Sequence, residues 1–75
     1  MISLKYIVKL IWDDEASIWY TESDDLPVFL NDYSYDNLIE RVRAAAPEVL
    51  EEAFGYIGHI DLIFESVRIE NAKVS

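Results

Sequence analysis

Apolar and polar positions alternate along the first stretch of the chain. The apolar residues of one parity are Ile2, Leu4, Tyr6, Val8, Leu10 and Trp12. Lysines and isoleucines occupy most of the positions between them. A period of two is typical of a β-strand, because successive side chains point to opposite faces. Residues 2–12 therefore predict a strand with one face fully buried.

Two further strands are predicted in the next part of the chain. The polar turn Asp13-Asp14-Glu15 is followed by residues 16–21, which are rich in β-branched and aromatic side chains. The close spacing predicts a hairpin, and the first two strands are then antiparallel. After the polar loop at residues 22–27, the apolar run at residues 28–30 predicts a short third strand.

Helical spacing of apolar residues extends over residues 38–57 and passes through Pro47. Ser34 is the predicted N-cap, and Gly55 or Gly58 is predicted to end the helix. Pro47 removes one backbone donor and crowds the preceding turn. The pattern therefore predicts either one kinked helix or two short helices that share an apolar stripe.

A last strand is predicted at residues 60–69, and its apolar positions change parity midway. Either a bulge or partial burial of both faces would produce this change. The predicted element order is β-β-β-α-β. It defines an α+β fold with an antiparallel-rich sheet and the helix on one face. Residues 1–75 form one predicted domain, without a C-terminal DNA-binding domain.

One helix can cover only one face of such a sheet, so the other face is solvated or bound by another molecule. Alternation places Lys5, Ile7, Lys9 and Ile11 of the first strand on the uncovered face. From the second strand, the residues expected there are Ser17, Trp19 and Thr21. Ile7, Ile11 and Trp19 are thus predicted to form an exposed apolar patch, a feature that marks interfaces. The alternative is that loops or the C-terminal residues 71–75 cover it.

The composition fits a folded domain without a metal or a cofactor. Hydrophobic residues make up 52% of the 75 residues, and the chain contains no cysteine and one histidine. Disulfides and thiolate metal sites are therefore excluded, which leaves a partner subunit as the most plausible additional source of stability. The absence of cysteine is typical of a reducing compartment, and no apolar run is long enough to span a bilayer. We expect a soluble, cytoplasmic protein.

The formal net charge is −9. Such a surface repels phosphate, which disfavours direct binding to nucleic acid. The same charge favours a basic partner, although acidity can also serve solubility alone. The acidic residues outside the apolar stripe of the helix are Asp36, Glu40, Glu48, Glu51 and Glu52. They are either a docking face for a basic partner or an ordinary solvated face, partly balanced by Arg41 and Arg43.

Candidate catalytic groups are few. Glu22, Asp24 and Asp25 could be imagined as metal ligands, but neighbouring residues on an extended chain point apart. His59 has no cysteine or second histidine to act with. We therefore expect a solvated acidic loop, a structural histidine and no enzymatic activity.

Four segments carry a resemblance to a known family. They are Trp12–Trp19, Glu22–Pro27, Leu38–Val42 and Ala46–Glu51. Their order and spacing resemble the HicB-like antitoxins, most closely the short single-domain members that are often described as a domain of unknown function. The resemblance extends from Tyr6 to about Phe64.

The resemblance implies a partial RNase-H-like fold that lacks the nuclease site. It also implies binding and inhibition of a small basic RNase toxin of the HicA type. Many members have Pro-Gly where this chain has Pro27-Val28, so the turn there is expected to differ. Longer members carry an additional operator-binding domain, so DNA binding and autorepression are not inferred for this chain.

Three functions follow from these observations. The first is an antitoxin that covers the active site of a basic RNase. The second is an orphan structural or regulatory homodimer that pairs through the Ile7, Ile11 and Trp19 patch. The third, a divergent RNase-H-like nuclease, is disfavoured by the scattered carboxylates.

Overall fold

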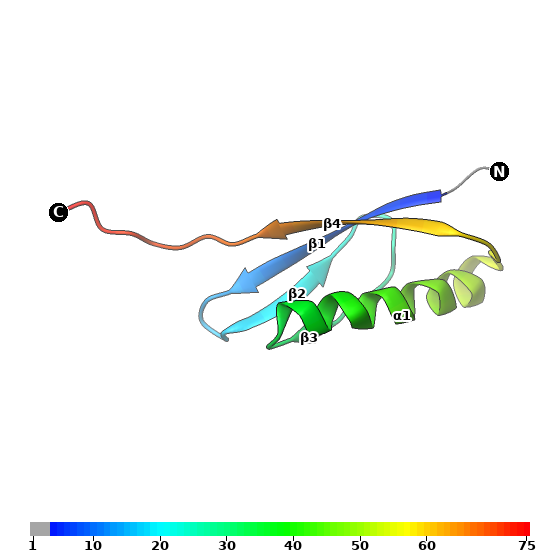
Figure 1. Cartoon of the computed structure of the whole chain (residues 1–75), viewed down its shortest axis with the longest axis horizontal. Helices are drawn as coiled ribbons and strands as arrows, with labels where there is room; N and C mark the ends of the chain where they lie inside the picture. The colour runs from blue at the N-terminus through cyan, green and yellow to red at the C-terminus, as the bar shows by residue number, and fades with distance from the viewer. Residues whose placement is uncertain (1–3) are drawn as a thin grey trace.

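The computed structural model describes residues 4–75, which fold into one sheet and one helix (Figure 1). The elements are β1 (Leu4–Asp13), β2 (Ile18–Glu22), β3 (Asn31–Asp32), α1 (Tyr35–Phe54) and β4 (Ile60–Val67). The strand order is β3-β2-β1-β4. β1 pairs antiparallel with β2 and parallel with β4, and β2 pairs antiparallel with β3. The predicted α+β class and β-β-β-α-β order are confirmed.

The core lies between α1 and one face of the sheet. The buried stripe of α1 consists of Leu38, Val42, Ala46 and Leu50. These residues recur every four positions, so they lie on one side of the helix. They pack against Val8 and Leu10 of β1 and against Leu26 and Val28 of the loop that follows β2.

The hairpin between β1 and β2 fixes which side chains face the helix. The Asp13 carboxylate accepts hydrogen bonds from the backbone N–H groups of Glu15 (3.1 Å) and Ala16 (3.3 Å). Ser17 then adopts a left-handed conformation, with φ of 53°. The resulting register pairs even-numbered residues of β1 with odd-numbered residues of β2.

This register overturns one prediction from the sequence. Trp12 lies opposite Trp19, and Leu10 lies opposite Thr21. Trp19 and Thr21 are therefore on the helix side of the sheet, and Ser17 lies in the turn. The prediction that these residues lie on the uncovered face was wrong, because the turn shifts the parity of β2 by one residue.

The predicted third strand is displaced towards the C-terminus. Residues 28–30 run beside β2 but form no regular ladder, because the side chain of Thr21 takes part in the pairing. Its hydroxyl donates to the Val28 carbonyl (3.0 Å) and accepts from the Leu30 N–H (3.0 Å). The regular pairing of β3 begins only at Asn31, which lies opposite Tyr20.

The helix is continuous through Pro47, so the prediction of one helix is the correct alternative. The predicted N-cap is confirmed, since the Ser34 hydroxyl accepts from the backbone N–H of Asn37 (3.2 Å). Gly55 ends the helix with φ of 67°, and its N–H donates to the Glu51 carbonyl (2.9 Å). Within residues 4–75, no helix is long and apolar enough to cross a membrane.

The last strand pairs with β1 in an unbroken register from Leu4 opposite Ile60 to Ile11 opposite Val67. No bulge interrupts this register, so the parity change has the second predicted cause, partial burial of both faces. Ile60, Leu62 and Phe64 pack against the core, whereas Ile63 and Val67 lie on the opposite face. Ile69 lies beyond the strand and is exposed.

Candidate interaction surfaces

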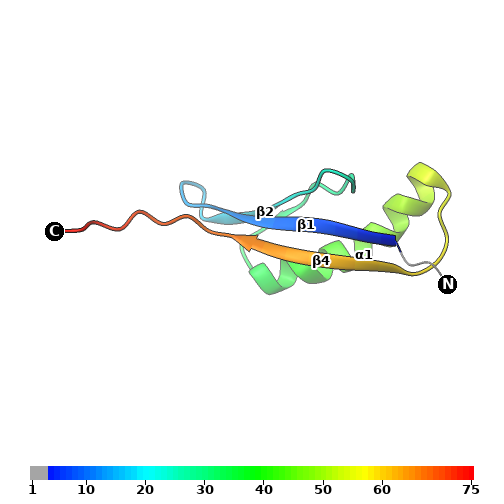
Figure 2. The same cartoon turned by 90° about the horizontal axis from the view of Figure 1, so that it is seen from above.

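The face of the sheet that points away from α1 is uncovered by the described residues (Figure 2). We call it the open sheet face. Ile7, Ile63 and Tyr20 on this face are 47%, 44% and 40% exposed. Ile11, Ile18 and Val67 are half-buried beside them. Ile7 and Ile11 thus lie where the sequence predicted them, and residues 71–75 run away from the sheet rather than over it (Figure 1).

Trp19 belongs to an aromatic cluster on the covered side. Its ring lies 5.3 Å from that of Trp12 and 5.0 Å from that of Tyr35, measured between centroids. The Arg68 guanidinium stacks on Trp12 at 4.7 Å from the ring centroid. Tyr35 and Ser66 also share a hydrogen bond between their hydroxyls. This cluster connects the start of α1 to the sheet, and Trp19 is therefore a packing residue rather than part of an exposed patch.

Charged residues on the open sheet face form rows that run across the strands. Lys5 of β1 lies beside Asp61 of β4. Lys9 of β1 lies between Glu22 of β2 and Glu65 of β4. Apolar rows separate the charged rows, since Ile7 lies beside Ile63 and Ile11 beside Val67. The face therefore alternates between charged and apolar rows along the strand direction.

The acidic surface of α1 is concentrated at its C-terminal end. In the first half of the helix, Arg43 contacts Glu40 (2.9 Å) and Arg41 contacts Asp32 (3.3 Å). Glu48, Glu51 and Glu52 follow as exposed residues, and the last turn has no basic residue. Two exposed apolar residues lie just beyond them, Phe54 (66%) and Ile57 (82%). We call these five residues the acidic helix end.

The position of Glu51 and Glu52, in the last turn of α1, is electrostatically unfavourable. The helix dipole places partial negative charge at the C-terminus, which disfavours acidic side chains and favours basic ones. The last turn thus has two carboxylates, Glu51 and Glu52, where helix stability alone would favour lysine or arginine. The predicted exposure of Glu48, Glu51 and Glu52 is confirmed, while their role in partner binding stays a prediction.

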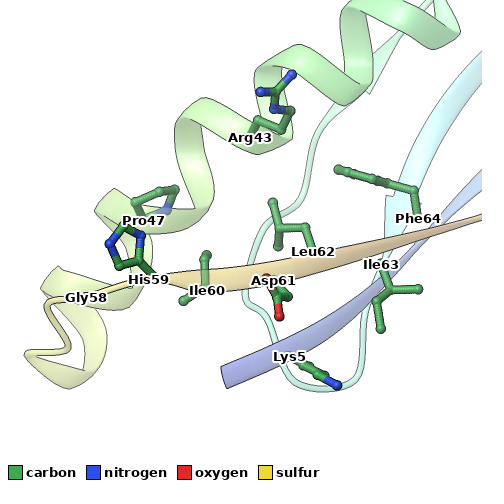
Figure 3. Close-up of a pocket in the computed structure, with 10 residues that line it drawn as sticks. All are labelled: Lys5, Arg43, Pro47, Gly58, His59, Ile60, Asp61, Leu62, Ile63 and Phe64. Carbon is green, nitrogen blue, oxygen red and sulfur yellow. The ribbon is translucent and has the colours of Figure 1, made fainter. Parts of the chain in front are cut away.

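A groove of about 700 Å³ follows the outer edge of β4, between that strand and α1 (Figure 3). Arg43 and Pro47 line it from the helix, and Leu62 and Phe64 line it from the strand. His59 is at one end, exposed, and its backbone carbonyl accepts a hydrogen bond from the Tyr56 hydroxyl (2.8 Å). No pattern in the sequence predicts this groove, because it depends on how the helix crosses an edge strand.

The acidic loop after β2 is held by hydrogen bonds of its own. The Ser23 hydroxyl donates to the Ile7 carbonyl (2.8 Å) and accepts from the backbone N–H of Leu26 (3.2 Å). Glu22, Asp24, Asp25, Lys9 and Glu65 line a hollow of about 260 Å³ there. Among residues 4–75, no group of three or more His, Asp or Glu side chains is arranged to hold a metal ion.

Asp32 has a pKa below its ordinary value of 3.8. The main cause is a hydrogen bond from the backbone N–H of Ser34 (2.8 Å). The Asn37 amide (2.6 Å) and the Arg41 guanidinium (3.3 Å) also stabilise the carboxylate. Since its partners come from the turn and the first turns of α1, Asp32 positions the helix start.

Comparison with known proteins places this fold in a family. The model of the family described as "Domain of unknown function (DUF1902)" matches residues 5–74. The chain belongs to this family. Its fold is similar to the crystal structure of a hypothetical protein, TTHA1013, from the extremely thermophilic bacterium Thermus thermophilus. The two share 28% identity with a TM-score of 0.74, over 91% of this chain and 99% of that chain. The comparison with curated proteins gave no match.

Proposed function

We propose that this DUF1902 protein is antitoxin-like and that it binds and neutralises a small basic RNase toxin of the HicA type. The sequence resemblance to HicB-like antitoxins supports this proposal. The β-β-β-α-β order agrees with the partial RNase-H-like fold that the resemblance implies. In this proposal the protein acts in the cytoplasm by binding, not by catalysis.

The acidic helix end is the observation that carries the proposal. Glu51 and Glu52 lie in the last turn, which has no basic residue, and they oppose the helix dipole. Glu48 adds a third exposed carboxylate one turn earlier. Sites that break a local stability rule are often functional sites. A basic surface placed against this end would supply the positive charge that the helix itself lacks.

This surface would increase both the association rate and the binding affinity of a basic RNase. Complementary charge accelerates encounter, and the chain has a net charge of −9. Phe54 and Ile57 provide exposed apolar area beside the carboxylates. A few residues buried at the centre of an interface supply most of the binding energy.

The experiment needs a basic partner and matched variants. Tagged protein is used to capture a small basic protein from its native cells, and that protein is assayed for RNase activity with and without the chain. The test variant is Glu48→Lys/Glu51→Lys/Glu52→Lys. The control is Glu15→Lys/Asp24→Lys/Asp25→Lys, which changes the net charge equally at exposed loop positions outside α1.

We expect the test variant to lose RNase inhibition and the control to retain it. Raised salt should slow association of the wild-type chain, because it screens exposed charges. Equal inhibition by both variants would remove the acidic helix end from the proposal. A captured protein without RNase activity would contradict the proposed function itself.

A further inference from the structure

We propose that the open sheet face is an interface between two copies of this chain, in which β1 of each copy lies over β4 of the other. This proposal concerns a different surface from the acidic helix end. It does not depend on the proposed toxin, because it is tested with the purified chain alone.

The charges on the open sheet face are balanced between β1 and β4. Lys5 and Lys9 are two of the six basic residues of the chain. Their neighbours on β4 are Asp61 and Glu65. A basic partner would meet both lysines here, whereas the charged residues of the acidic helix end are all carboxylates. The β1–β4 part of the open sheet face, which Glu22 of β2 flanks, therefore suits a partner that carries both signs of charge.

A second copy supplies that pattern when the two sheets face each other. We consider a twofold axis that is parallel to the strands and passes between β1 and β4. This axis places β1 of one copy over β4 of the other, in the same direction, so that residues of the same cross-strand row meet. Facing sheets pack about 10 Å apart with their strands nearly aligned.

In each of the four cross-strand rows, complementary side chains of the two copies then lie opposite each other. The contacts between the two copies are Lys5 with Asp61, Ile7 with Ile63, Lys9 with Glu65 and Ile11 with Val67. Opposite charges meet in two rows, and apolar side chains meet in the other two. Ile7 and Ile63 are the exposed isoleucines at the centre, at 47% and 44%. Burial of these apolar rows provides the driving force, and the charged rows set the register.

These charges are not held by ion pairs within one copy. Within residues 4–75, the ion pairs join arginines to acids: Arg41 to Asp32, Arg43 to Glu40 and Arg68 to Glu70. Lys5 and Lys9 take part in none of them. Both lysines can therefore contact carboxylates of a second copy without breaking an ion pair.

Pairing through the free edge of β4 fits less well. If two antiparallel copies of β4 were centred on Ile63, Asp61 would lie opposite Glu65. If they were centred on Phe64, Glu65 would lie opposite Ile63. Like charges directly opposite each other are destabilising, and a charge opposite an isoleucine gains nothing. The face-to-face arrangement avoids both costs.

The test combines two charge-reversed variants. Lys5→Glu/Lys9→Glu makes all charged side chains of the four rows acidic, and Asp61→Lys/Glu65→Lys makes them all basic. Each variant alone would place like charges across the interface, whereas a mixed dimer would place opposite charges in both charged rows. Sedimentation measures the mass of each sample against the monomer mass of 8.7 kDa. Circular dichroism verifies that each variant is folded.

We expect the wild-type chain to form a dimer that dissociates on dilution, because two strands of overlap give a small interface. Each variant alone should be monomeric, and an equimolar mixture should form a one-to-one heterodimer. The control Asp14→Lys/Glu15→Lys makes the same charge change as Asp61→Lys/Glu65→Lys, in the turn after β1 and outside the four rows. It should dimerise as the wild-type chain does.

Three results would overturn the proposal. They are a wild-type monomer at every concentration up to about 1 mM, a dimer that persists in Lys5→Glu/Lys9→Glu, and folded variants that do not combine. If a charge reversal prevents folding, Ile7→Ser/Ile63→Ser replaces it. This variant removes the central apolar row, and its dimer should dissociate at least about tenfold more readily. An unchanged dissociation constant would then contradict the interface.

Discussion

Single residues determine where α1 begins and which side chains it covers. Asp32 accepts hydrogen bonds from Ser34, Asn37 and Arg41, and so connects β3 to the first turns of the helix. Trp19 packs between Trp12 and Tyr35 on the covered side of the sheet. Both residues stabilise the fold, and predictions about their substitution can be tested without a partner.

The first prediction concerns the pH dependence of stability. The pKa of Asp32 is lowered in the folded chain, so its ionised form stabilises the fold above the ordinary value of 3.8. This contribution is lost as the pH falls from 3.8 through the lowered pKa. Asp32→Asn should therefore reduce the free energy of unfolding at neutral pH, and the difference from wild type should shrink in acid. Urea denaturation of both chains at neutral pH and below pH 3.8 measures the difference in the free energy of unfolding. A difference that is the same at both pH values would contradict this role of Asp32.

The second prediction tests the corrected register of the hairpin. Trp19→Lys would insert a charge into the aromatic cluster, and we expect it to cost more than about 2 kcal/mol of stability. Tyr20→Lys, on the open sheet face, should change the stability of the dilute chain by less than about 1 kcal/mol. Equal losses in the two variants would mean that Trp19 is not on the covered side.

Most elements could be predicted from local sequence signals. The alternation in residues 2–12, the Ser34 cap and the Gly55 stop specify β1 and α1 with few alternatives. The face of β2 could not be predicted in the same way, because it depends on the turn after Asp13. A change of one residue in the length of that turn moves every side chain of the strand to the opposite face of the sheet. This explains why Trp19 was assigned to the wrong face.

The helix is the element whose sequence departs most from what stability favours. Pro47 lies inside it and removes a hydrogen bond, while Glu51 and Glu52 oppose the dipole at its C-terminus. Exposure of these glutamates follows from helical periodicity alone. The nearby exposure of Phe54 required the three-dimensional structure.

The third prediction measures the cost of these glutamates. Glu51→Gln/Glu52→Gln should stabilise the chain by about 0.3–1 kcal/mol per residue, because each removes a charge from the unfavourable end of the dipole. Asp36→Asn, in the first turn, should destabilise it by a similar amount. Thermal denaturation at low salt compares the stability of each variant with that of the wild-type chain. Stabilisation by both variants would indicate a general effect of net charge rather than of the dipole.

At the scale of the whole molecule, the two exposed surfaces differ in charge. The open sheet face has balanced charges between β1 and β4, which suits a second copy. The acidic helix end has carboxylates and two apolar residues, which suits a basic partner. Because the surfaces are on opposite sides of the sheet, a dimer paired through its sheets would leave both acidic helix ends accessible to partners.

Titration of RNase activity tests the central proposal most directly. The basic protein captured with the chain is assayed on RNA while the purified chain is added in increasing amounts. The account predicts that RNase activity falls to background when the chain reaches an equimolar amount, and that the Glu48→Lys/Glu51→Lys/Glu52→Lys variant fails to reduce it. RNase activity that is unchanged by excess wild-type chain would contradict an antitoxin function.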